Sequence, residues 1–375
     1  MNRNYISIKI EGDFIDSFIY SGTLFLVDAN SHITTYNWEG LLNAVLCNVQ
    51  RDLFEFLKDC RQYLTIEGNK SQEIIYIEID EDNLKSQLTG EVLSLNGWST
   101  DINVYSNCLY IADETGVEAM NFDYQQKAID PSLRFQVWGG YAYKISPNNG
   151  QRLAIAAGIN GVITAFPRKN FIKPEDIKVI DIDSCDCEWI GNYLIANSDT
   201  GTFVSVFDEL PQKPEKPDDI FYKNLNDIKK KPPDIQEISN YSKESIAYAW
   251  MSGSKLFSLL SDGKLVTANI DLFNANNSTQ TETKLPMLSN ILSARSGLFG
   301  AVIEIGDDLF SLTENGVDLI SHRPVSWRVF PRAKNYLNHL HIIENDYLII
   351  RAYFVNSNND SDCYGISLDD VNRYS

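Results

Sequence analysis

Two closely spaced pairs of possible metal ligands are the first candidates for chemistry in this sequence. Cys185 and Cys187 are separated by one residue, and so are His339 and His341. Thiolate and imidazole groups are common zinc ligands, but paired cysteines in zinc sites usually have at least two residues between them. The two pairs also lie far apart in the chain. We therefore expect structural roles for these residues and predict no metal and no cofactor.

The common local signatures of hydrolytic and phosphate-binding sites do not occur in the chain. There is no Gly-x-Ser-x-Gly nucleophile elbow, no His-Glu-x-x-His motif and no glycine-rich phosphate loop. The sequence therefore predicts a protein that is not an enzyme. An enzyme whose site is assembled from scattered residues stays open as an alternative.

Acidic residues recur in short turns between apolar segments. The turn residues that carry a carboxylate are Asp28, Asp113, Glu114, Asp199, Asp262 and Glu314. Asp, Asn and Gly are favoured in tight hairpin turns, and Asp can stabilise a turn through hydrogen bonds to its own backbone. The alternative hypothesis is a negatively charged rim that binds a basic segment of a partner or a cation.

The apolar segments on both sides of these turns read as short strands, and the pattern repeats along the chain. A repeat of four strands with such a turn predicts a β-propeller. Seven blades of roughly 40–45 residues need about 300 residues, so the 375-residue chain has room for insertions. We predict an all-β fold, a seven-bladed β-propeller, with residues 1–375 forming a single domain.

The ends of the repeat array are expected to meet. The alternating strand at residues 5–10 would complete the blade that begins near 327–330, which removes an open edge. In the sixth unit we predict strands near 285–288 and at 300–303, 309–312 and 317–320. A further strand at residues 74–79 leaves an eight-bladed count open.

Blade length and strand order resemble those of WD40 propellers. The Gly-His and recurring Trp-Asp motifs of that family are missing, and the nearest endings are Tyr36-Asn37-Trp38 and Phe207-Asp208. The resemblance therefore implies the general layout of the disc, and no family function is carried over to this chain.

Two insertions fall in connections on one face of the predicted disc. Within residues 39–90, apolar residues recur at three- and four-residue spacing, which predicts a helical insertion between the first and second blades. Phe54 and Phe56 widen its apolar stripe, so the helix could either cover the disc or dock a partner. The Pro- and Lys-rich residues 209–234 predict an exposed, partly extended loop.

Trp189 and Trp250 lie in predicted innermost strands. Most tryptophans in propellers pack between blades, but these two could reach the central channel and stack on a sugar or peptide. They are our candidates for a channel site.

Composition narrows the range of partners. The formal charge is −19, from 51 acidic and 32 basic side chains, which argues against a nucleic acid as the main ligand. No apolar run approaches the roughly 20 residues of a membrane span, and the N-terminal residues read as a strand. With six cysteines, a reducing cytoplasmic location is the simplest expectation.

The leading functional hypothesis is a non-catalytic protein-interaction scaffold, a propeller subunit of a multi-protein complex. Its loops would bind one or more protein partners, first on the face with the insertions and second, for a basic segment, on the acidic face. The alternative is a propeller enzyme or a glycan- or peptide-binding protein that uses the channel mouth. A channel lined by Arg, Glu and Tyr from several blades would favour this alternative, and an apolar, filled channel would favour the scaffold.

Overall fold

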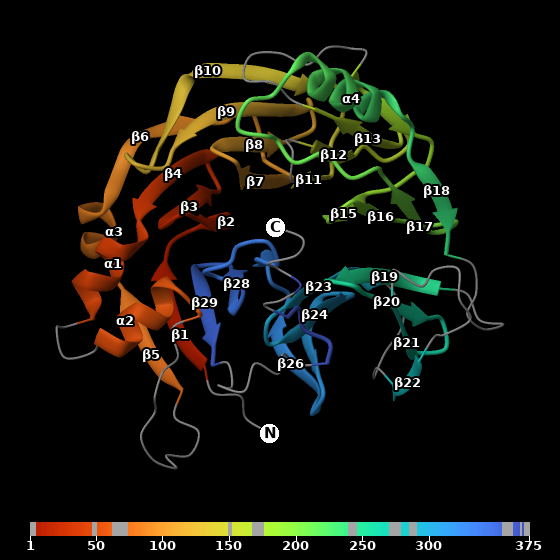
Figure 1. The fold of residues 1–375 in the computed structure, drawn as a ribbon. Coiled ribbons are helices and arrows are strands. Elements are labelled where there is room, and N and C mark those ends of the chain that lie inside the picture. Colours follow the sequence, from red (N-terminus) through yellow and green to blue (C-terminus); the bar gives the residue numbers. More distant parts are fainter. Residues whose placement is uncertain are drawn as a thin grey trace.

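Seven β-sheets stand around a central axis and form a closed disc (Figure 1). The computed structural model describes residues 5–46, 51–61, 74–148, 152–166, 176–238, 246–269, 279–284, 291–354, 363–367 and 370. Six sheets have four strands and the seventh has five. The prediction of a seven-bladed β-propeller with the general layout of WD40 propellers is therefore confirmed.

The strands of each blade are lettered a to d from the axis outward. Blade 1 contains β2 (Phe14–Tyr20), β3 (Thr23–Asp28), β4 (His32–Asn37) and β6 (Leu88–Ser94). Blade 2 contains β7 (Asp101–Tyr105), β8 (Cys108–Ala112), β9 (Val117–Asp123) and β10 (Ala128–Trp138). Blade 3 contains β11 (Lys144–Asn148), β12 (Arg152–Ala156), β13 (Val162–Ala165) and β14 (Lys178–Ile180). Blade 4 contains β15 (Asp186–Ile190), β16 (Tyr193–Ser198), β17 (Gly201–Val206) and β18 (Asp234–Glu237).

The remaining three blades follow the same order. Blade 5 contains β19 (Ile246–Ser252), β20 (Lys255–Leu260), β21 (Lys264–Asn269) and β22 (Thr279–Lys284). Blade 6 contains β23 (Ile291–Gly297), β24 (Gly300–Ile305), β25 (Asp308–Thr313) and β26 (Gly316–His322). Blade 7 contains β27 (Ser326–Val329), β28 (His339–Glu344), β29 (Tyr347–Tyr353) and β1 (Tyr5–Glu11), with β5 (Ile75–Ile79) outside β1.

Strand β1 closes the disc as strand d of the last blade. It pairs antiparallel with β29 along its whole length, and Ile6, Ile8 and Ile10 on one of its faces are fully buried. Strand β5 pairs parallel with β1 on the other side. The additional strand therefore extends blade 7 and does not start an eighth blade.

The prediction for blade 6 was one strand out of register. The strand that we read as its innermost, 300–303, belongs to β24, and the innermost strand is β23. Strand β23 was missed because Ser293, Arg295 and Ser296 interrupt its apolar pattern. The predicted strand near 285–288 lies outside the described residues.

The two faces of the disc are defined by their loops. Because neighbouring strands in a blade run in opposite directions, a–b and c–d connections share one face, here the a–b face. The b–c and d–a connections share the other, here the b–c face. The c–d connection of blade 1 contains α1 (Trp38–Val45), α2 (Arg51–Lys58) and α3 (Glu81–Ser86). The predicted helical insertion is therefore present, within the c–d connection of blade 1.

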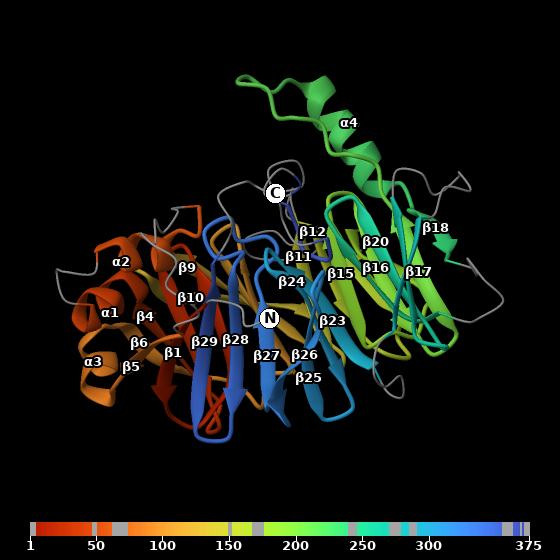
Figure 2. The ribbon, with the colours of Figure 1, turned by 90° about the horizontal axis from the view of Figure 1, so that it is seen from below.

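The Pro- and Lys-rich residues 209–234, which we predicted as an exposed, partly extended loop, are exposed but contain a helix. Helix α4 (Asp219–Lys230) starts at Asp218, whose carboxylate accepts a hydrogen bond of 2.8 Å from the Phe221 amide. None of its residues is buried, and it projects from the disc (Figure 2). No helix in the described part of the chain is long and apolar enough to cross a bilayer.

Candidate functional site

A central cavity of about 590 Å³ lies among the innermost strands and is lined by charged side chains. Residues from five blades contribute its polar lining: Asp101 and Tyr105 (blade 2), Lys144 (blade 3), Glu188 (blade 4), Arg295 (blade 6), Arg328 and Arg332 (blade 7). Of the two kinds of channel that the sequence left open, this is the polar one. By the criterion given above, that observation favours the alternative hypothesis, an enzyme or a glycan- or peptide-binding protein that uses the channel mouth.

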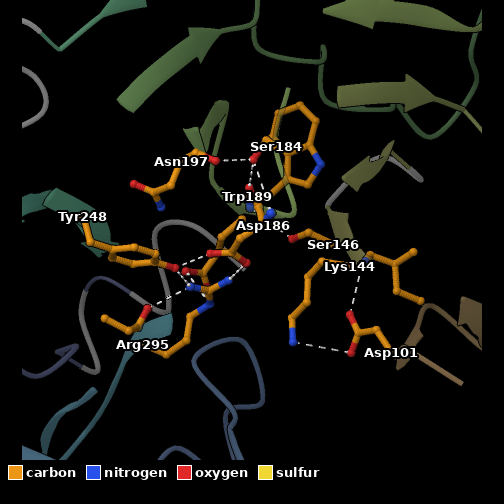
Figure 3. A network of polar contacts seen from close by, with 12 residues as sticks. Asp101, Lys144, Ser146, Ser184, Asp186, Trp189, Asn197, Tyr248 and Arg295 are labelled. Atoms are coloured by element: carbon orange, nitrogen blue, oxygen red, sulfur yellow. Dashed lines mark hydrogen bonds and ion pairs between the residues drawn. The ribbon is translucent and has the colours of Figure 1, made fainter. Parts of the chain in front are cut away.

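Arg295 joins blade 6 to blades 4 and 5 through three polar partners (Figure 3). Its guanidinium pairs with Asp186, and its Nε lies 3.1 Å from Oε2 of Glu188. Its Nη1 donates a hydrogen bond of 3.2 Å to the hydroxyl oxygen of Tyr248. The Tyr248 hydroxyl in turn donates to Asp186. These contacts bridge three sheets at the centre of the disc.

The pKa values of the two carboxylates beside Arg295 are shifted in opposite directions. Burial alone would raise the pKa of Asp186, but attraction to Arg295 and a hydrogen bond from it hold that pKa below the usual value. Burial raises the pKa of Glu188, because Arg295 offsets only part of the loss of hydration. Glu188 is thus the carboxyl group in this network that most lacks compensating contacts.

Arg328 forms a second network in the cavity. Its Nη2 lies 2.6 Å from Oδ2 of Asp16 and 2.8 Å from Oδ1 of Asp101. Lys144 Nζ lies 3.7 Å from the same Asp101 oxygen. Burial raises the pKa of Asp16, and Arg328 offsets this only in part. The network ties blade 7 to blades 1, 2 and 3.

Our sequence reasoning missed all of these channel residues. Ionic partners such as Arg328 and Asp16 are 312 positions apart, so no local sequence pattern can predict their pairing. One signal was available: in strand β2, Asp16 and Ser17 interrupt a run of apolar residues, and a buried charged residue needs a partner.

Trp189 and Trp250, our predicted channel residues, lie in the core between blades. Both are almost completely buried, and neither is among the lining residues of the cavity. The ring of Trp250 stacks on Phe257 with centroids 5.3 Å apart, and the ring of Trp189 packs against Phe207 at 4.7 Å. Blade packing therefore accounts for both residues, and the channel prediction is wrong for them.

The helical insertion uses its phenylalanines mainly for packing. Phe56 is 2% exposed and stacks on Phe354 with ring centroids 5.2 Å apart, so it is not available to a partner. Phe54 is only partly buried, packs against the same core and lies 5.9 Å from Nζ of Lys58. A docking role for Phe54 stays a prediction.

Most of the predicted acidic turn residues do lie in b–c turns. Asp28 accepts hydrogen bonds of 2.9 Å from the amides of Asn30 and His32. Asp113 is buried and accepts from the Thr115 amide at 2.7 Å, so it stabilises its turn and cannot face a partner. The turn carboxylates that remain for a partner on this face are the exposed Glu114 and Asp199, together with the half-buried Asp28 and Asp262.

Glu314 does not belong to this group. The turn that contains it joins β25 to β26, which are strands c and d of blade 6, so it lies on the a–b face. Its misplacement follows directly from the register error in that blade. The b–c turn of blade 6 instead contains Asp307. None of the predicted turn carboxylates is among the residues that line the cavity.

The two pairs of possible metal ligands do not come together. Cys185 is exposed whereas Cys187 is buried, and both His339 and His341 are completely buried in blade 7. Within the described ranges, no group of three or more His, Cys, Asp or Glu side chains could hold a metal ion.

A second candidate site covers the b–c face of blades 2, 3 and 4. It consists of six loops, at residues 96–100, 113–116, 139–143, 157–161, 181–185 and 198–200. Its exposed large side chains are Trp98, Tyr141, Tyr143 and Ile159. Its exposed carboxylates are Glu114, Asp181, Asp183 and Asp199. The six loops contain no lysine or arginine. We call this region the aromatic–acidic surface.

Hydrogen bonds join these loops from one blade to the next. Thr100 Oγ1 donates to the Ala142 carbonyl oxygen at 2.6 Å, and the Ala142 amide donates to the Asp113 carbonyl at 3.2 Å. Further along, the Gly158 amide donates to the Ser184 carbonyl at 3.0 Å. The loops of three blades thus support one another and form a continuous surface.

Two tyrosines at the centre of this surface are held by close packing. The rings of Tyr141 and Tyr143 lie with centroids 4.5 Å apart. The Tyr143 ring also lies on Gly158, whose φ of +58° and missing side chain allow the contact, since a Cβ there would come within 2.8 Å of the ring. The aromatic groups are therefore positioned before any partner binds.

Comparisons with known proteins give no family for this chain. No family model matches the chain, and no curated protein matches it. Among solved structures, 1289 chains match. One is the WD40 domain of Pan2 from Neurospora crassa, with a TM-score of 0.48 and 7% sequence identity over 92% of each chain.

Proposed function

We propose that this chain is a non-catalytic protein-interaction module that binds a Lys- and Arg-containing segment of a partner through the aromatic–acidic surface. The observation that carries the proposal is the composition of the six loops, which combine four exposed apolar or aromatic side chains with four exposed carboxylates and no cation. The module would serve as a subunit of a larger assembly.

The chemistry of the surface supports a cationic partner. Trp98 is 66% exposed and Ile159 is 87% exposed, which is unusual for large apolar side chains unless a partner covers them. Aromatic rings attract the ammonium of Lys and the guanidinium of Arg, and neighbouring carboxylates add long-range attraction. The formal charge of −19 would steer a basic segment toward the chain.

Cys60, Cys108, Cys185 and Cys187 are free thiols, which suits a reducing compartment, and we place the module in the cytoplasm on that ground.

A peptide-binding experiment tests the proposal. The probe is a short fluorescent peptide in which Lys and Arg alternate with Gly, and binding to the full chain is followed by anisotropy. We expect Trp98→Ala and Tyr143→Ala each to weaken binding by about two- to fivefold, the range of a cation–π contact at an exposed site. Asp183→Asn should also weaken it, and added salt should reduce affinity because the charges are exposed.

Tyr76→Ala is the matched control, because Tyr76 is a similarly exposed aromatic residue on β5 at the outer edge of blade 7. It should leave binding unchanged. Equal losses in Tyr76→Ala and Trp98→Ala, or equal affinity for an acidic peptide of the same length, would rule the proposal out.

A further inference from the structure

The guanidinium of Arg332 differs from the other two arginines of the channel. Arg295 and Arg328 each lie within ion-pair distance of two carboxylates. Arg332 bonds only to neutral oxygens, the Oγ of Ser146 at 3.3 Å and the carbonyl of Pro147. Among the described residues, no carboxylate forms an ion pair with it. Its charge in the cavity is therefore available to an anionic group.

Arg332 reaches across the channel from the long a–b connection of blade 7. Its partners Ser146 and Pro147 belong to β11 in blade 3. Tyr105, at the a–b end of β7, lines the same part of the cavity. The guanidinium thus lies toward the a–b face, away from the aromatic–acidic surface.

Glu188 is the complementary group next to Arg332. Ser146 Oγ, which Arg332 contacts, accepts a hydrogen bond of 3.0 Å from the Trp189 amide, the residue after Glu188 (Figure 3). Glu188 is 6% exposed, and its Oε2 has no hydrogen-bond donor although Arg295 Nε is 3.1 Å away. A buried carboxylate oxygen without a donor is costly, so a donor from a ligand would be stabilised there.

The pKa shifts of both groups agree with this incomplete pairing. Burial lowers the pKa of Arg332, and the attraction of Glu188 offsets it only in part. Burial likewise raises the pKa of Glu188. An opposite charge placed beside either group would move its pKa back toward the ordinary value.

We propose that the channel binds a small zwitterion, an α-amino acid, with its carboxylate on Arg332 and its ammonium on Glu188. A cavity of about 590 Å³ accommodates such a molecule together with its side chain. Phe18, Val104 and Phe330 supply apolar lining beside the charged groups. The ligand is neutral overall, so it satisfies both groups without adding net charge to the centre of the disc. This site is independent of the peptide-binding function proposed above.

The test compares three molecules that share one side chain. L-phenylalanine carries both charged groups, 3-phenylpropionate lacks the amine, and phenethylamine lacks the carboxylate. Binding to the full chain is measured by calorimetry, after a thermal-shift comparison of the twenty common L-amino acids selects a stronger probe if there is one. We expect the amino acid to bind at least tenfold more tightly than its analogue without the amine and its analogue without the carboxylate.

Two variants assign the groups. Arg332→Gln should remove the advantage that the carboxylate gives, and Glu188→Gln should remove the advantage of the amine. Arg351→Gln is the control, since Arg351 lies outside the cavity over the Tyr5 ring. Thermal unfolding of each variant shows whether it is folded, and Arg332→Met, which also lacks the charge, replaces Arg332→Gln if the glutamine variant does not fold.

Three outcomes overturn the proposal. The first is that none of the twenty amino acids shifts the unfolding temperature. The second is that acetate binds as tightly as the amino acid. The third is that Arg332→Gln and Arg351→Gln weaken binding equally. None of these outcomes bears on the peptide experiment, which uses the other face of the disc.

Discussion

Replacement of Ile8 by alanine should show that the N-terminal strand holds the ring together. Ile8 is completely buried and pairs with Ile350 of β29 on one side and with Ile77 of β5 on the other. The substitution removes a buried side chain from a junction of strands that are distant in sequence. Large-to-small substitutions of this kind cost about 2–5 kcal/mol, because the lost burial adds to the cavity left behind.

The neighbouring Lys9 provides the matched control. It lies on the same strand, and its side chain forms surface ion pairs with Glu11 and Glu78. Lys9→Ala should leave the free energy of unfolding nearly unchanged. Both variants are followed by tryptophan fluorescence in urea, where Ile8→Ala should lower the midpoint with the same slope. Equal midpoints for the two variants would refute the closure.

Removal of residues 1–10 extends the same reasoning. The deletion takes away three fully buried isoleucines, so the summed cost of about 6–15 kcal/mol approaches the whole stability of a typical domain. We expect loss of cooperative unfolding throughout the disc. A truncated chain that melts at the temperature of the intact chain would contradict the account.

Three other predictions concern buried groups and one turn. Burial lowers the pKa of His339 from 6.5 to about 3. Below about pH 6.5, His339 therefore binds a proton in the unfolded chain but stays neutral in the folded chain. Stability should therefore fall as the pH drops through that window, by roughly 2–3 kcal/mol at pH 4.5, and urea unfolding should show a smaller fall in His339→Leu. Gly161→Ala should lower the free energy of unfolding by about 1–3 kcal/mol, because φ is +87° and a Cβ would lie 2.5 Å from a carbonyl oxygen of β14. Gly97→Ala is the control, since a Cβ there meets no atom within 4 Å. Equal melting temperatures for the two variants would contradict the expectation. Arg328→Met leaves two buried carboxylates without their partner and should lower the free energy of unfolding by about 3–5 kcal/mol. A second substitution, Asp16→Asn, should recover part of that loss. An Arg328→Met variant as stable as the parent would show that the network does not contribute to stability.

The sequence predicts the parts of this fold that depend on local pattern. Hairpin turns between short apolar strands identify most strands of blades 1 to 5. The apolar pattern is interrupted in β23, an innermost strand, because Arg295 and two serines occur in it. That one missed strand shifted blade 6 and moved Glu314 to the wrong face.

Helix α4 shows a different kind of failure. The prolines on both sides of it suggested an extended loop, and local composition outweighed the helical spacing of Phe221, Leu225 and Ile228. Asp218, directly after Pro217, was a usable start signal, since Asp is a favoured helix N-cap. A run of twelve residues without Pro or Gly follows it.

The candidate sites were the least accessible to sequence reasoning. Arg332, Ser146 and Glu188 come from three different blades, and only the closed ring brings them to one cavity. The aromatic–acidic surface likewise joins loops of three blades. The acidic turns in the sequence predicted that this face could bind a partner. No local sequence pattern distinguishes Trp98, Tyr141 and Tyr143 from other aromatic residues of the chain.

Hydrogen–deuterium exchange of the full chain with and without the Lys- and Arg-containing peptide tests the binding surface most directly. The account predicts slower amide exchange in residues 96–100, 139–143 and 157–161 when the peptide is bound, with no change in helix α4. Protection confined to α4 and the a–b face, or no protection in the three loops, would contradict it.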